Sequence, residues 1–200
     1  MAALIESTLN NRYLPYIEFA TPAPALIGSY KVGPVRWYDR SEVPEDAILS
    51  SPHKSLPEFL AVSGQGAASL AVKDLIESLE PGRHQFFPVT IRRARGDKPI
   101  LLRDGSVLDA PYYVMYPGVH LDAVWVDRSP DVRVTGTGLV QFSFTTRERG
   151  TVLRRSVTTG HHFWCGNTHL AGSTFFSDEL ARAVVDRNWK GLEFKNVREE

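Results

Sequence analysis

Three features are scarce in this sequence: cysteine, an excess of charge of one sign, and long apolar runs. Cys165 is the single cysteine in 200 residues, so no intrachain disulfide can form and a reducing compartment is favoured. Acidic and basic side chains balance at 23 each, which argues against a nucleic-acid binder that works through bulk charge. No apolar stretch approaches the length of a membrane helix, and residues 1–11 lack the pattern of a signal peptide. We therefore expect a cytoplasmic protein that binds neither nucleic acid nor membrane.

The remaining composition is that of an ordinary globular protein, with 42% hydrophobic and 23% charged residues. Prolines are concentrated near the start of the chain, which disfavours long regular elements there. We expect a single domain over residues 1–200, with a loop-rich N-terminal part over residues 1–58.

Residues 175–197 predict one helix followed by one strand. Ser177 can accept a hydrogen bond from a free amide of the first helical turn, and Leu180 and Val184 fall on one face at helical spacing. Gly191 suits the left-handed residue that ends a helix. Beyond it, apolar and charged residues alternate, as in a half-buried strand.

The same pattern occurs earlier in the chain. When Ser69 is aligned with Ser177 without a gap, apolar residues face one another along residues 69–89 and 177–197. The matched pairs are Val72 with Leu180, Leu75 with Ala183, Ile76 with Val184, Phe86 with Phe194, and Val89 with Val197. We predict two similar helix–strand units, each laying its helix on a shared sheet, although a few matched positions can also arise by chance.

The first of these units is expected to comprise a helix over residues 67–80 and a strand over residues 84–92. Pro88 falls inside that strand and removes a backbone donor. The strand should therefore lie at a sheet edge or carry a bulge.

The region between the two units is rich in short strands. Residues 112–116 and 119–126 predict two strands, residues 138–145 and 151–158 predict a hairpin, and residues 161–165 predict one more strand. Two helices among several strands indicate an α+β fold, with mixed, mostly antiparallel sheets and two main helices.

The most metal-like group of side chains is His161, His162 and Cys165 with His169, because imidazole and thiolate suit zinc. The spacing is poor for one site, since neighbouring residues of a strand point to opposite faces. Ordinary strand or loop histidines are the simpler interpretation, and a small metal-dependent enzyme is the alternative. The sequence contains no nucleophile-elbow motif either. We expect no catalytic centre and no cofactor.

Two short clusters, residues 37–40 and residues 147–149, could contact a protein partner, because Trp, Tyr and Arg dominate interface hot spots. The simpler interpretation is that residues 37–40 pack an aromatic side chain on the core and that the arginines of residues 147–149 are solvated charges in a turn. The candidate partner-binding residues are Trp37, Tyr38, Asp39, Arg40, Arg147 and Arg149.

The order of several segments over residues 59–197 resembles a known family. The segments are residues 59–62, the helix over 69–80, residues 86–89, 112–115, 121–124 with 127–129, 162–163, and 176–180 continuing to 191–194. Together they are similar to the immunity-protein family numbered eleven among bacterial polymorphic toxin systems, so we take residues 59–197 as the family-like core.

This resemblance implies a bacterial protein that protects its producer by binding a toxin encoded nearby, stoichiometrically and without a cofactor or turnover. A non-catalytic regulatory binding module that has no toxin partner remains a further alternative.

Overall fold

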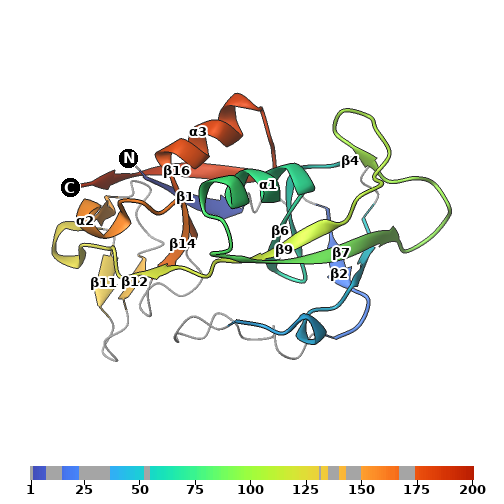
Figure 1. Cartoon of the computed structure of the whole chain (residues 1–200), viewed down its shortest axis with the longest axis horizontal. Helices are drawn as coiled ribbons and strands as arrows, with labels where there is room; N and C mark the ends of the chain where they lie inside the picture. Colours follow the sequence, from blue (N-terminus) through green and yellow to red (C-terminus); the bar gives the residue numbers. More distant parts are fainter. Residues whose placement is uncertain are drawn as a thin grey trace.

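The computed structural model describes residues 2–7, 15–22, 37–51, 55–130, 132–134, 140–142, 150–166 and 174–200. Within these ranges the chain forms two six-stranded sheets. Two helices, α1 (Leu70–Leu79) and α3 (Asp178–Asp186), lie on the same side of the sheets (Figure 1). The fold is therefore α+β, as predicted.

The first sheet has the strand order β2-β3-β7-β9-β6-β5, and the second has the order β10-β14-β15-β1-β16-β13. Pairing is antiparallel except between β3 and β7, β10 and β14, and β13 and β16. The strands of the first sheet are β2 (Ile17–Phe19), β3 (Asp46–Leu49), β5 (Phe59–Val62), β6 (Gln65–Ala68), β7 (Gln85–Arg93) and β9 (Tyr112–Tyr116). Those of the second are β1 (Ala2–Ser7), β10 (His120–Leu121), β13 (Val152–Leu153), β14 (Phe163–Gly166), β15 (Thr174–Ser177) and β16 (Leu192–Glu199).

Short elements complete the described part of the chain. Two small ribbons pair β4 (Ser55–Leu56) with β8 (Leu101–Leu102) and β11 (Val132–Val134) with β12 (Val140–Phe142). One-turn helices are η1 (Arg40–Glu42), η2 (Val126–Arg128) and α2 (Arg155–Thr158).

The two predicted helix–strand units are real and extend further than the sequence indicated. Each unit is a β-hairpin, a helix and a strand in the same order: β5, β6, α1 and β7 in the first, and β14, β15, α3 and β16 in the second. In each unit the last strand also pairs in parallel with a further strand, β3 in the first unit and β13 in the second. We expected the two units to share one sheet, but each unit has a sheet of its own.

The register of the central strands shows how close the likeness is. In the first unit, Tyr113 of β9 pairs with Ala68 of β6 and with Pro88 of β7. In the second, Ala3 of β1 pairs with Phe176 of β15 and with Asn196 of β16. These pairs coincide under the same gap-free alignment that matches the two helices. The second unit therefore takes its central strand from the beginning of the chain, whereas the first takes it from the segment that follows β7.

A shared core joins the two units beneath the helices. Val72 and Ile76 of α1 and Leu180 and Val184 of α3 are buried there with the ring of Phe163. Burial of each such side chain contributes about 1.5–3 kcal/mol. Each sheet has a further core of its own, whereas the core under the helices is shared by both units.

Ser63, in the turn between β5 and β6, closes the first sheet on itself. Its N–H donates to Ile17 O at 2.9 Å, and its Oγ accepts from Phe19 N at 2.9 Å. Ser63 has a φ of 48°, a left-handed conformation that a non-glycine residue adopts only at a cost. The two bonds to β2 offset this cost and protect an otherwise open edge.

Contrary to expectation, β7 is an interior strand despite Pro88. Thr90 N donates to Glu45 O on the β3 side, and hydrogen-bonding direction repeats every second residue of a strand. The missing N–H of Pro88 would therefore point to the same side, where β3 has not yet begun. Arg40 Nη2 instead caps Pro88 O there at 3.1 Å. The proline thus sits where its strand has a partner on one side only.

Two further predictions were wrong. Residues 119–126 contribute only the two-residue β10, which joins the second sheet, followed by η2. Residues 151–158 form β13 and then α2; β13 pairs with β16, whereas residues 140–142 of the expected partner form β12, which pairs with β11.

Candidate functional site

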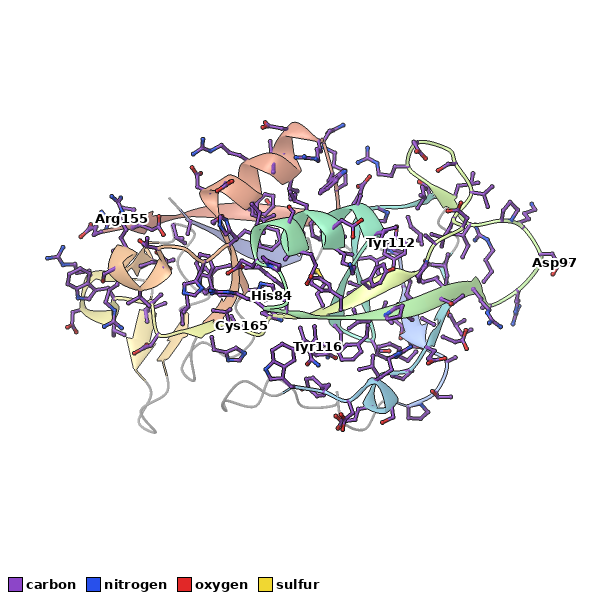
Figure 2. All side chains as sticks on the ribbon, in the orientation of Figure 1. His84, Asp97, Tyr112, Tyr116, Arg155 and Cys165 are labelled. Atoms are coloured by element: carbon purple, nitrogen blue, oxygen red, sulfur yellow. The ribbon has the colours of Figure 1, made fainter. Side chains whose placement is uncertain are left out.

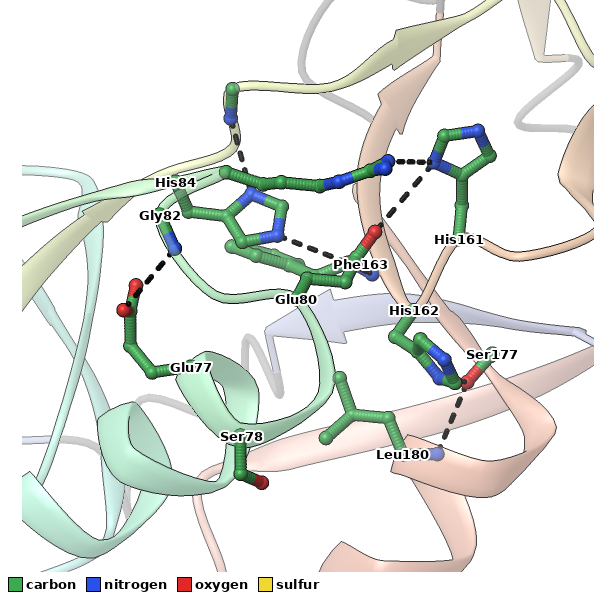
Figure 3. A network of polar contacts seen from close by, with 12 residues as sticks. Glu77, Ser78, Glu80, Gly82, His84, His161, His162, Phe163, Ser177 and Leu180 are labelled. Atoms are coloured by element: carbon green, nitrogen blue, oxygen red, sulfur yellow. Dashed lines mark hydrogen bonds and ion pairs between the residues drawn. The ribbon is translucent and has the colours of Figure 1, made fainter.

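The junction between the two units contains a buried carboxylate, Glu80. Helix α1 ends at Leu79, and Glu80 is its C-cap. The side chain is only 2% exposed and points towards β14 of the second unit (Figure 3). Unpaired ionised groups are rarely buried, so the surroundings of this carboxylate are informative.

Two donors bind the same oxygen of this carboxylate. Glu80 Oε2 accepts from His84 Nε2 at 3.0 Å and from the backbone N–H of Phe163 at 2.8 Å. Burial alone would raise the pKa of Glu80, but the hydrogen bonds from His84 and from the backbone of Phe163 and His162 outweigh it and lower the pKa. Glu80 is therefore held as a carboxylate that links the end of α1 to the start of β14.

The hydrogen bond to the second nitrogen of His84 sets the tautomer of its ring. The backbone N–H of Gly118 donates to Nδ1 at 3.2 Å, so Nδ1 carries no proton and Nε2–H is the donor to Glu80. The chain Gly118–His84–Glu80–Phe163 thus connects β9, β7, α1 and β14 through three hydrogen bonds.

The other carboxylate oxygen is different. Glu80 Oε1 is buried and has no hydrogen-bond partner in the described part of the chain. His161 Nδ1 lies 3.6 Å from it and 3.5 Å from Arg83 Nη1. Nδ1 can accept from Arg83 only when it carries no proton and can donate to Glu80 only when it carries one, so the two contacts exclude each other.

The metal-like group predicted from sequence is dispersed. His161 faces Glu80, whereas His162 Nδ1 lies 3.0 Å from Ser177 Oγ at the start of α3 (Figure 3). Cys165 contacts Thr174 Oγ1 at 4.0 Å, and burial raises the pKa of its thiol to about 11. His169 lies outside the described residues. Among the residues that are described, no three His, Cys, Asp or Glu side chains gather in a way that could hold a metal ion.

The predicted partner-binding cluster contains three residues with structural contacts. The Tyr38 ring packs on Tyr116 with centroids 4.6 Å apart. Asp39 forms a capping box at the start of η1. Arg40 donates to Val43 O at 2.7 Å and pairs with Glu45 at 3.1 Å. Arg147 and Arg149 lie outside the described residues.

Trp37 differs from its neighbours because it is 54% exposed. A Cβ on Gly118 would lie 3.2 Å from the Trp37 indole and 2.0 Å from Arg83 O. Trp37 and the Arg83 backbone therefore close over the same glycine, whose N–H binds His84. Trp37 and His161 belong to separate clusters in the sequence. In the structure Trp37 packs on Gly118, which binds His84, and His161 faces Glu80, which binds the same histidine (His84 is labelled in Figure 2).

Sequence reasoning missed Glu80, Arg83 and His84. The only local signal is the Pro81–Gly82 turn, which predicted the end of a helix but not the burial of the residue before it. The contact between Glu80 and β14 joins distant parts of the chain and has no signature in the local pattern.

Comparison with protein families places this chain in a known group. The model of an immunity protein family, Imm11, matches residues 20–199. The chain belongs to the Imm11 family. Comparison of this Imm11 protein with curated proteins found no match. In the described residues, no helix is long and apolar enough to cross a membrane.

Proposed function

We propose that this Imm11 protein binds a toxin encoded beside its own gene and neutralises it by stoichiometric contact in the cytoplasm, as part of a polymorphic toxin system used in competition between bacteria. The family match over residues 20–199 carries this proposal, because membership in an immunity protein family implies protection from a toxin and a non-enzymatic role.

The physical requirements of such protection are modest. An interface of about 1,600 Å² in total is enough for a stable complex, and slow release depends on a few aromatic or arginine anchors surrounded by near-neutral contacts. Trp37 is an exposed aromatic residue of this kind. Tyr38, Asp39 and Arg40, the other residues of this cluster, make structural contacts that fix the backbone next to Trp37.

The alternative of a metal-dependent enzyme finds no support from the positions of its residues. His161 faces Glu80 after the end of α1, His162 contacts Ser177 at the end of β15, and Cys165 contacts Thr174 at the start of β15. The regulatory-module alternative rests on no specific structural observation.

Co-expression with the neighbouring gene tests the proposal. The full chain should restore growth to cells that express the neighbouring toxin and should co-purify with it. A matched strain that carries an empty vector sets the baseline. Cells that stay inhibited although the protein is soluble and abundant would contradict the proposal.

A further inference from the structure

Each of the two sheets closes into a ring, and the closing segments match. In the first sheet, β2 lies between β3 and the turn after β5. In the second, residues 120–125 lie between β14, which pairs with β10, and β13, to which a single bridge joins them. Ala20 N donates to Asp46 O at 2.9 Å at the end of β2. Trp125 N donates to Val152 O at 2.8 Å at the same place in the second ring. Residues 120–125 are therefore the counterpart of β2.

The two rings follow the same order along the chain except for one strand. The first ring is formed by β2, β3, β5, β6, α1, β7 and β9, and the second by residues 120–125, β13, β14, β15, α3 and β16. The counterpart of β9 is β1, which precedes all the others. Both partners of β1, β15 and β16, belong to the second ring. The chain thus attaches β1 to the first ring, whereas hydrogen bonds attach it to the second.

The interiors of the rings differ in side-chain size at three matched positions. The pairs are Tyr112 of the first ring with Ala2 of the second, Leu60 with Trp164, and Ala67 with Phe175. In the first core, the large Tyr112 of the central strand accompanies the small Ala67 of β6. In the second core, Ala2 accompanies the rings of Trp164 and Phe175, which stack 5.8 Å apart. Because protein interiors are close-packed, the slot between β15 and β16 selects a strand with a small residue at this position.

We propose that the slot between β15 and β16 is a binding site for an extended peptide, that β1 is its ligand, and that β1 of a second copy of this chain can occupy it. The recognised chemistry is the backbone of a strand that pairs antiparallel on both sides, with a small side chain at the position of Ala2.

The pairing of β1 does not depend on which chain supplies the strand. Residues 2–5 pair with β15 and residues 2–7 with β16, and the same backbone hydrogen bonds form with a strand from another copy. Attachment through a short linker gives a strand an effective concentration on the order of millimolar. The attached β1 therefore fills the slot of its own chain in dilute solution, and a free strand competes once the attachment is cut.

Peptide exchange after cleavage tests the proposal. A protease recognition sequence inserted between Ser7 and Pro15 of the full chain allows β1 to be cut from the first ring. The cut protein is unfolded in urea and refolded with an excess of a labelled peptide of residues 1–8, which should co-elute with it in size-exclusion chromatography. A peptide with Ala2→Phe should bind at least about 10-fold more weakly, because it overpacks the core. The matched control, Ala2→Gly, should change binding by less than about 5-fold.

The size rule is also testable in the uncut chain, where Ala2→Phe should lower the urea midpoint of unfolding. In a variant with Trp164→Leu and Phe175→Ala, which gives β14 and β15 the residues of the first ring, the same Ala2→Phe change should raise the midpoint. The same sign of effect in both backgrounds would overturn the size rule.

A permuted chain provides a second test. Since Ala2 pairs with Val197, the two ends of the chain lie close together (Figure 1). A chain that begins at Pro15 and carries residues 1–14 after Glu200, through a short Gly-Ser linker, should fold with the urea midpoint of the wild type. If the cut protein does not refold, the permuted chain decides, and its failure to fold would overturn the proposal. A refolded cut protein that does not retain the wild-type peptide would also overturn it. No toxin enters these measurements, so their outcome is independent of the proposed function.

Discussion

Replacement of Glu80 tests whether the buried carboxylate joins the two units. Glu80→Ala removes the acceptor for two buried donors, His84 Nε2–H and Phe163 N–H. Each buried donor left without a partner costs about 1–3 kcal/mol, and breaking one side of a buried polar pair costs about 3–5 kcal/mol. We therefore expect Glu80→Ala to lower the free energy of unfolding by about 3–5 kcal/mol.

Glu80→Gln is the matched variant, because its amide oxygen can replace Oε2 and keep both hydrogen bonds. Neutral acceptors form weaker bonds than charged ones, so this variant should lose only about 1–2 kcal/mol. Its NH₂ group would take the place of Oε1 and face His161 Nδ1, the atom that accepts in the wild type.

The pH dependence of the two proteins should differ. The folded-state pKa of Glu80 lies below its ordinary value of 4.5, so its contribution to stability is present above that value and is lost as pH falls through the folded-state pKa. The stability difference between wild type and Glu80→Gln should therefore shrink below pH 4.5. Urea unfolding followed by tryptophan fluorescence measures both effects. A loss below about 1 kcal/mol for Glu80→Ala, or a wild-type advantage over Glu80→Gln that stays constant with pH, would refute the reasoning.

Three further predictions concern positions with clear structural contrasts. Gly191→Ala should lower the free energy of unfolding by about 3 kcal/mol or more, because φ is 101° and a Cβ would lie 1.8 Å from Phe59 O. Gly160→Ala, with φ 81° and open space around it, should lower it by about 1 kcal/mol in the same urea titration. Ser177→Ala should lower the stability measured by thermal unfolding by about 1 kcal/mol, because Ser177 Oγ accepts from Leu180 N. Ser69→Ala should leave the stability almost unchanged, since the Ser69 side chain makes no such bond. Equal losses in the two variants would contradict the capping assignment. Cys165, whose pKa is raised to about 11 by burial, should react slowly with a thiol reagent at pH 8 in the folded protein and rapidly in urea; equal rates would show that the thiol is accessible.

The helices were predictable because their signals are local. Ser177 caps α3 through Leu180 N, as its position before the acidic first turn indicated. The apolar spacing of α1 and α3 also gave the repeat, since the buried residues Val72 and Leu180 occupy equivalent places. The α+β fold class could be predicted from these two helices and from the number of short strands.

The remaining errors come from contacts that are distant in sequence. The segment over residues 2–7 is short and contains alanine, and only its pairing with β15 and β16 makes it the central strand of the second sheet. The β-branched residues around residue 157 favour a strand, but Arg155 N bonds Glu200 O and one turn of helix, α2, forms instead.

The candidate site was the least predictable part. A glutamate at the end of an amphipathic helix is normally solvated, and Glu80 is buried because β14 of the other unit packs over it. His161 was considered for metal binding because of its neighbours in sequence, yet its contacts are Glu80 and Arg83, which no spacing rule connects to it.

The most direct test of immunity by stoichiometric binding is a titration of the purified toxin's activity with increasing amounts of this protein. Inhibition should increase linearly and be complete at a fixed molar ratio close to one protein per toxin, with the complex recovered intact by size-exclusion chromatography. Full protection by a small fraction of an equivalent would indicate turnover and would contradict the binding mechanism.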